Sequence, residues 1–200
     1  MSELYYPSPY HFYGEPFVAR IEGEDYKRCE EASKNMWCNS KPGKYGAGLA
    51  NTNQDPYKVS RVGKLGEMAF AKLFRLGIDL SYKKGGDETD CIIDGKKIDI
   101  KTALRNYNTG LIYKTNEWGK EVPLKSDIYV FAHLKEEDRE SKIALITLVG
   151  YCYKAQVLNA KVAKGRKRGS KHYNYEIPYL HLKPIYELQS ELNINGQLNA

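Results

Sequence analysis

The chain has 200 residues, of which 42% are apolar and 12% aromatic, so it is long and apolar enough to bury a core. Lys and Arg outnumber Asp and Glu by 31 to 25, and the net charge of +6 permits a polyanionic partner such as DNA. No run of about 18 apolar residues occurs, as a membrane span would require, and the N-terminal residues lack the apolar stretch of a signal peptide. We therefore expect a cytoplasmic protein without a membrane partner, in the host cytoplasm if the source is viral.

Residues 1–55 are expected to form an N-terminal extension packed on the main domain. Residues 1–20 are rich in Tyr and Pro, which predicts an extended aromatic arm. Apolar residues at helical spacing then predict a helix over 21–37. The stretch 39–56 is dense in Gly, Asn and Pro and predicts a loop.

A second helix is predicted to begin at Asp55 and Pro56, because Asp caps free N–H groups and Pro is tolerated in the first helical turn. Gly77 is expected near its end. Its core-facing residues, spaced by three or four positions, are Val62, Leu65, Ala69, Leu73 and Leu76. Glu67 lies off this stripe and is either a solvated residue or a functional carboxylate. Gly63 and Gly66 each weaken a helix by about 1 kcal/mol relative to Ala, which indicates close approach of the helix to the sheet or to DNA.

The segment after this helix predicts a tight β-hairpin. Asp94-Gly95 suits a two-residue turn that needs positive φ at both positions. With this turn Asp90 opposes Asp99, and the alternation of side chains places both on one face together with Lys101. The opposite face would carry Cys91, Ile93, Ile98 and Ile100. A register slip of one residue would exchange the two faces.

Two opposed carboxylates repel each other unless a cation lies between them. Hard divalent ions prefer carboxylate and carbonyl oxygens, so we expect Asp90, Asp99 and the backbone carbonyl of Ile100 to bind Mg²⁺ or Mn²⁺. Glu67 would complete this site or support its ligands. Lys101 would hold the scissile phosphate and orient the attacking water. A solvated hairpin face is the alternative interpretation of the same residues.

Glu67 within GKLGEMAF, followed by Asp90 and by Asp99-Ile100-Lys101, resembles the D…(D/E)xK core of the PD-(D/E)XK nuclease superfamily. This superfamily includes restriction endonucleases, Holliday junction resolvases and phage repair nucleases. The resemblance covers roughly residues 60–150, and Thr89 stands where the family pattern has Pro. It implies catalytic roles for Glu67, Asp90, Asp99 and Lys101, and it leads us to expect a phage or viral protein with a task in DNA repair or recombination.

The expected fold class is α/β (α+β) with a restriction-endonuclease-like core over 56–188, followed by a polar tail over 189–200. The core would be a central mixed sheet of four or five strands flanked by helices on both faces. The apolar runs 127–134 and 143–151 predict central strands covered on both sides. Residues 104–123, with Tyr107, Tyr113 and Trp118, predict a substrate-binding lid. A helix is predicted over 154–163 and an edge strand after residue 173.

Between residues 141 and 175 the chain has eight Lys or Arg and no acid, which exceeds the whole positive surplus. Such a run is either a solvated loop or a contact to the DNA backbone, and the neighbouring metal motif favours DNA. The residues expected to bind nucleic acid are Lys161, Lys164, Arg166, Lys167, Arg168 and Lys171. The four cysteines are scattered and have no zinc-binding spacing, so free thiols are expected.

These observations together predict a metal-dependent DNA endonuclease. No recognition helix is evident, so structure-selective or weakly sequence-specific cutting is expected. A Holliday junction resolvase acting as a homodimer is one alternative. A non-catalytic DNA-binding protein that keeps the nuclease fold is another, and a structural protein without a nucleic-acid partner is the third.

Overall fold

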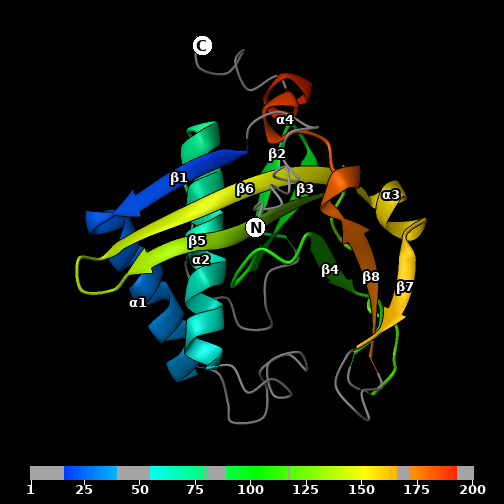
Figure 1. Ribbon diagram of the computed structural model, residues 1–200, viewed down its shortest axis with the longest axis horizontal. Coiled ribbons are helices and arrows are strands. Elements are labelled where there is room, and N and C mark those ends of the chain that lie inside the picture. Colours follow the sequence, from blue (N-terminus) through cyan, green and yellow to red (C-terminus); the bar gives the residue numbers. More distant parts are fainter. Residues whose placement is uncertain are drawn as a thin grey trace, which may run out of the picture.

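The computed structural model describes residues 16–39, 55–78, 80, 89–116, 118–165 and 172–192 (Figure 1). Its elements in chain order are β1 (Phe17–Glu22), α1 (Gly23–Asn39), α2 (Pro56–Phe74), β2 (Cys91–Ile93), β3 (Lys96–Ala103), β4 (Thr109–Tyr113), β5 (Ile128–Asp138), β6 (Ile143–Tyr153), α3 (Lys154–Leu158), β7 (Lys161–Lys164), β8 (Tyr173–Pro178), the 3-10 helix η2 (Tyr179–His181) and α4 (Ile185–Glu191). Residues 1–15 of the predicted arm over 1–20, most of the predicted loop and the end of the polar tail lie outside the described residues.

A five-stranded sheet with strand order β1-β6-β5-β3-β2 forms the centre of the fold. β3 and β5 are parallel, whereas the other neighbouring strands are antiparallel, so the predicted mixed sheet is confirmed. β5 is central, and its first six residues are buried, as the apolar run predicted. β1, which belongs to the predicted N-terminal extension, is an edge strand of this same sheet and lies beside β6 (Figure 1).

The helices α1 and α2 pack on one face of the sheet, around a core that also contains residues of α4 (Figure 1). α2 begins as predicted, because the Asp55 side chain accepts a hydrogen bond from the backbone N–H of Tyr57 at 3.0 Å. It ends at Phe74, before the expected Gly77, since Arg75 adopts a left-handed conformation with φ of 52°. Val62, Leu65 and Ala69 form the buried stripe, while Leu73 and Leu76 are partly buried.

The opposite face of the sheet packs mainly on a second sheet, so the expectation of helices on both faces is wrong except for the short α3. This three-stranded sheet has the order β4-β8-β7. Its Ile112, Tyr175 and Ile177 form a second core with Tyr129 and Phe131 of β5. β8 and β7 lie side by side in Figure 1.

Two sequence predictions are corrected by this second sheet. The predicted lid over 104–123 contains a regular strand, β4, which pairs along its length with β8. The predicted helix over 154–163 ends at Leu158, and the chain then turns into β7, which pairs with β8. The reason is tertiary, because backbone pairing with β8 is available only in the folded chain.

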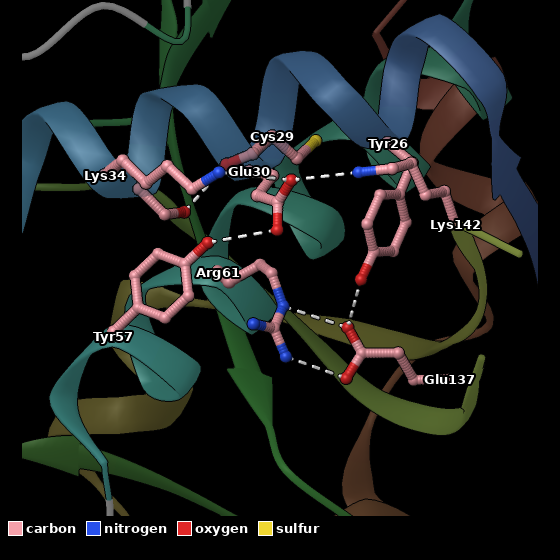
Figure 2. A network of polar contacts seen from close by, with 9 residues as sticks. Tyr26, Cys29, Glu30, Lys34, Tyr57, Arg61, Glu137 and Lys142 are labelled. Carbon is pink, nitrogen blue, oxygen red and sulfur yellow. Dashed lines mark hydrogen bonds and ion pairs between the residues drawn. The ribbon is translucent and has the colours of Figure 1, made fainter. Parts of the chain in front are cut away.

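A buried ionic network fixes α1 and α2 to the hairpin formed by β5 and β6 (Figure 2). The Arg61 guanidinium is only 1% exposed and donates two hydrogen bonds of 2.9 Å to the Glu137 carboxylate. The Tyr26 hydroxyl donates to the same carboxylate at 2.9 Å. Burial, followed by this contact with Glu137, raises the pKa of Tyr26 to about 12. Around Glu30 the network continues with Tyr57 and Lys142.

No helix in the described part of the chain has the length and apolar character that crossing a membrane requires. Cys29, Cys91 and Cys152 are free thiols.

Candidate functional site

The predicted hairpin forms with the predicted register. Asp94 and Gly95 have φ values of 48° and 71°, as a two-residue turn of this kind needs. Ile93 pairs with Lys96, and the ladder continues with two further pairs, Ile92 with Lys97 and Cys91 with Ile98. Ile93, Ile98 and Ile100 are buried in the first core. The two faces of the hairpin are therefore those that the sequence predicted.

Asp90 lies one residue beyond this ladder, so the expected direct pairing with Asp99 is not formed. The Asp90 backbone N–H donates to the Ile98 carbonyl at 3.0 Å, and the Thr89 hydroxyl donates to the same oxygen at 2.6 Å. With both bonds made to Ile98, the pairing of the two strands ends at Cys91, and Asp90 does not lie opposite Asp99. The Asp90 carboxylate instead accepts a hydrogen bond of 2.6 Å from the backbone N–H of Ile100.

The backbone carbonyl of Ile100 points to the β2 side of β3, at a position where β2 no longer pairs with β3. Backbone groups alternate along a strand, and the Lys97 carbonyl accepts a bond from Asp127, on the side of β5. The Ile98 carbonyl accepts from Asp90 on the opposite side, and Ile100 follows two positions later. Its carbonyl is thus directed away from the ladder with β5, in the direction of Asp90.

Glu67 reaches the hairpin from α2. It is 9% exposed, so it is not a solvated helix residue. Its carboxylate accepts a hydrogen bond of 2.8 Å from the Lys64 ammonium, which is also buried. The negative charge of Glu67 is one of the causes that raise the pKa of Asp90. The neighbouring Gly66 packs against Thr102 of β3, so the fold brings the helix turn with Glu67 to the hairpin, although Asp90 lies 23 residues after Glu67 in the sequence.

Lys101 is half-exposed and contacts the carboxylate of Asp99. Its ammonium group lies 2.6 Å from Asp99 Oδ2 and 2.9 Å from Oδ1. The two residues share one face of β3, as the alternation of side chains predicted. The cluster thus contains three carboxylates and two lysines.

The pKa of the Asp90 carboxyl is raised to about 7. Burial is the largest cause, followed by the negative charges of Glu67 and Asp99. The Ile100 N–H and the Lys101 charge act in the opposite direction without cancelling these effects. Removing this repulsion requires either a proton on Asp90 or an additional cation.

The donor chemistry of this cluster fits a hard divalent ion. Carboxylates and a backbone carbonyl are oxygen ligands of the kind that Mg²⁺ and Mn²⁺ prefer. Within the described ranges, however, no group of three Asp, Glu, His or Cys side chains converges closely enough to hold a metal ion. Both Asp99 oxygens contact Lys101, so a metal ion bound to Asp99 would compete with this lysine.

Lys64 was missed by the sequence analysis. It could have been found from its spacing of three positions to Glu67, which allows a contact on one side of a helix. Tyr113 was expected only as part of a lid, and it lies on β4, which contacts the strand that carries Lys101. Its position depends on the packing of β4, which no local pattern indicates.

The predicted nucleic-acid contacts are only partly within the described residues. Lys161 and Lys164 are exposed on β7, and the Lys161 ammonium lies 3.9 Å from Glu176. The remaining predicted contacts, Arg166, Lys167, Arg168 and Lys171, lie outside the described residues.

Comparison of this chain with protein-family models, with curated proteins and with solved structures gives no match.

Proposed function

We propose that this protein is a metal-dependent DNA endonuclease of the PD-(D/E)XK type, with a restriction-endonuclease-like core. The observation that carries the proposal is a set of contacts around the hairpin. The Ile100 N–H holds the Asp90 carboxylate at 2.6 Å, and Lys101 contacts Asp99 at 2.6 Å. Glu67 follows Gly66, which packs against Thr102 of β3. The residues come from α2 and from both arms of the hairpin. Burying like charges together costs free energy, so a cluster of this kind is better explained by a bound cation than by stability.

Asp90, Asp99 and the Ile100 carbonyl would hold Mg²⁺ or Mn²⁺, with Glu67 completing the site. A divalent ion bound there would supply Lewis acidity for phosphodiester hydrolysis. Lys64 donates a hydrogen bond of 2.8 Å to the Glu67 carboxylate and so orients it. The Ile100 N–H fixes one oxygen of Asp90 and so orients the carboxylate.

Lys101 would bind the scissile phosphate. Its ammonium group is partly exposed and already lies next to an anionic oxygen of Asp99. A phosphate oxygen can replace that partner, because both are anionic acceptors of the same hydrogen bond. The charge of Lys101 would then offset the negative charge that develops on the phosphoryl oxygens.

The basic run would hold the DNA backbone. Lys161 and Lys164 on β7 are exposed, and together with Arg166, Lys167, Arg168 and Lys171 they would neutralise phosphates without reading bases. Binding through phosphates is weakly sequence-specific and falls with salt concentration.

The proposal is tested by incubating purified protein with supercoiled plasmid and Mg²⁺ or Mn²⁺, and by measuring nicking. Asp99→Asn and Lys101→Met should each lower the nicking rate by at least 100-fold, the order of magnitude for loss of one group that stabilises developing charge. Glu31→Gln on α1 and Lys96→Met at the start of β3 are exposed controls and should cut like the wild type. Equal nicking by wild type and Asp99→Asn would identify a contaminating nuclease.

The alternatives are separated by two further measurements. A homodimeric Holliday junction resolvase would elute as a dimer in gel filtration and would cut a four-way junction much faster than linear duplex. A non-catalytic DNA-binding protein would bind DNA with a strong salt dependence but would leave every substrate intact with either metal.

A further inference from the structure

The second sheet, which packs on β5, also exposes large apolar side chains. Seven of the twelve exposed large apolar side chains in the described ranges lie on this sheet or in the segments that flank β4. They are Tyr107, Leu111, Tyr113, Trp118, Val122, Val162 and Tyr173. The strand register places Leu111 and Tyr113 on the outer face of the sheet, whereas Val162 and Tyr173 share the opposite face with Tyr175. Scattered exposed apolar residues are ordinary, but exposed apolar side chains that share one face indicate a binding surface.

Trp118 is the most exposed of these residues, at 71%, and yet its backbone is held firmly. The side-chain oxygen of Asn116 accepts hydrogen bonds from the N–H groups of Trp118 and Lys120, at 3.0 and 2.9 Å. The backbone of Asn116 also pairs with Gly119 and Lys120. An indole presented by such a closed turn loses little conformational freedom when it binds a ligand.

The same part of the chain carries the positive charge. The described parts of segments 104–125 and 159–178, which contain the three strands, have six Lys or Arg and two Glu. These parts therefore carry a net charge of +4, against +6 for the whole chain. Leu111 and Lys161 both pair with Glu176 of β8, so the Lys161 cation lies on the same face of the sheet as Leu111 and Tyr113.

This surface is continuous with the candidate site through β4. A Cβ at Gly110 would lie 2.1 Å from the Phe131 ring, so β4 crosses closely over β5. Phe131 pairs with Lys101 in the register of β3 and β5. Tyr113 lies at the other end of β4, and β4 contacts β3, the strand that carries Lys101. Tyr113 also packs edge-on against His172, with ring centroids 5.8 Å apart.

From this arrangement we infer that the second sheet binds an unpaired DNA strand and leads it past Lys101, with Tyr113 and Trp118 stacking on its bases. Aromatic rings can stack only on bases whose faces are open, and in a duplex these faces are covered by neighbouring base pairs. The cations around the rings neutralise the phosphates of the same strand. This inference rests on the proposed nuclease function and names its substrate class: single strands, or the unpaired region of a branched or frayed duplex.

The test measures binding without cleavage. Fluorescence anisotropy of a labelled single strand of about 20 nucleotides, long enough to span one binding surface, is followed in EDTA and compared with the matching duplex. We expect the single strand to bind at least tenfold more tightly, and to quench the fluorescence of Trp118. Tyr113→Ala and Trp118→Ala should each weaken single-strand binding by about fivefold to 150-fold, the range for loss of one stacked base.

Tyr186→Ala on α4 is the matched control, because Tyr186 is equally exposed but lies outside this sheet. Tyr113→Phe should bind like the wild type, since stacking needs the ring and not the hydroxyl. Circular dichroism verifies that each variant is folded. Equal or tighter binding of the duplex, or equal effects of Tyr113→Ala, Trp118→Ala and Tyr186→Ala, would overturn the inference. Because no metal is present, these results are independent of whether the protein cuts DNA.

Discussion

Gly66 of α2 lies directly against Thr102 of β3. A Cβ at position 66 would fall 1.8 Å from Thr102 Oγ1, and it would also meet the Thr102 Cβ and Cγ2 atoms at 2.9 and 3.0 Å. This contact fixes how closely the helix approaches the strand that carries Asp99 and Lys101. Glu67 is the next residue along the helix, so its reach toward the hairpin depends on the absence of a side chain at Gly66.

Gly66→Ala should therefore destabilise the protein, whereas Gly63→Ala should stabilise it. Rotation of Thr102 cannot relieve the clash, because all three of its branch atoms lie close to the new methyl group. Overpacking of this kind costs about 1–3 kcal/mol. At Gly63 nothing lies within 4 Å of a new Cβ, so Gly63→Ala should gain up to about 1 kcal/mol of helix stability. Urea unfolding measures both; changes of the same sign would contradict the contact.

Asp90→Asn should stabilise the protein, and more at pH 8 than at pH 5. The carboxyl pKa is raised from 3.8 to about 7 in the folded state. The folded protein therefore keeps a proton that the unfolded chain has lost between these values, and stability falls as pH rises through this window. The gain at pH 8 should be on the order of 2–4 kcal/mol, since each unit corresponds to about 1.4 kcal/mol.

Urea unfolding of wild type and Asp90→Asn at the two pH values, in EDTA, gives this difference directly. A gain that is the same at both values would show that the effect is one of packing and not of charge. Addition of Mg²⁺ at pH 8 should stabilise the wild type more than the variant, because the ion would replace the missing countercharge at Asp90.

Lys64→Met should destabilise the protein by about 3–5 kcal/mol, because it leaves the buried carboxylate of Glu67 without its cation. The double variant Lys64→Met, Glu67→Gln should recover most of this loss. A double-mutant cycle by urea unfolding checks the coupling. If Lys64 also balances the charge of the site, Lys64→Met should bind Mn²⁺ more tightly than the wild type in a calorimetric titration. Additive effects of the two single changes would refute the pairing.

Arg61→Met should also cost about 3–5 kcal/mol, since Glu137 would lose both of its 2.9 Å bonds to the guanidinium within the network of Figure 2. Lys27→Met is the matched control, because the ion pair of Lys27 with Glu24 is exposed, and little change in thermal unfolding is expected there. Below the unfolding transition, the nicking rate of Arg61→Met should equal that of the wild type, because Arg61 donates its hydrogen bonds to Glu137, which lies outside the proposed site. A loss of nicking in the folded variant would place the network in the mechanism.

The sequence by itself determined the hairpin and the start of α2. Asp94-Gly95 permits few turns, and a period of two then assigns every neighbouring side chain to a face, so local chemistry was sufficient. Asp55 and Pro56 likewise act on the helix that they precede. The apolar run in β5 predicted a strand buried on both faces, because such a run has no solvent-facing residues.

Only the tertiary structure decided the burial of Glu67, its pairing with Lys64 and the departure of Asp90 from the ladder. The first two depend on the distance between α2 and the sheet. The third depends on hydrogen bonds donated by the Thr89 hydroxyl and the Ile100 N–H, which the alternation of side chains along a strand does not predict. The second sheet belongs to the same class. β4, β7 and β8 are short, and they form strands because they pair with one another and pack on β5. The pairing of β4 with β8, whose residues Tyr113 and Asn174 are 61 positions apart, is a property of the folded chain, since no local pattern specifies which edges meet.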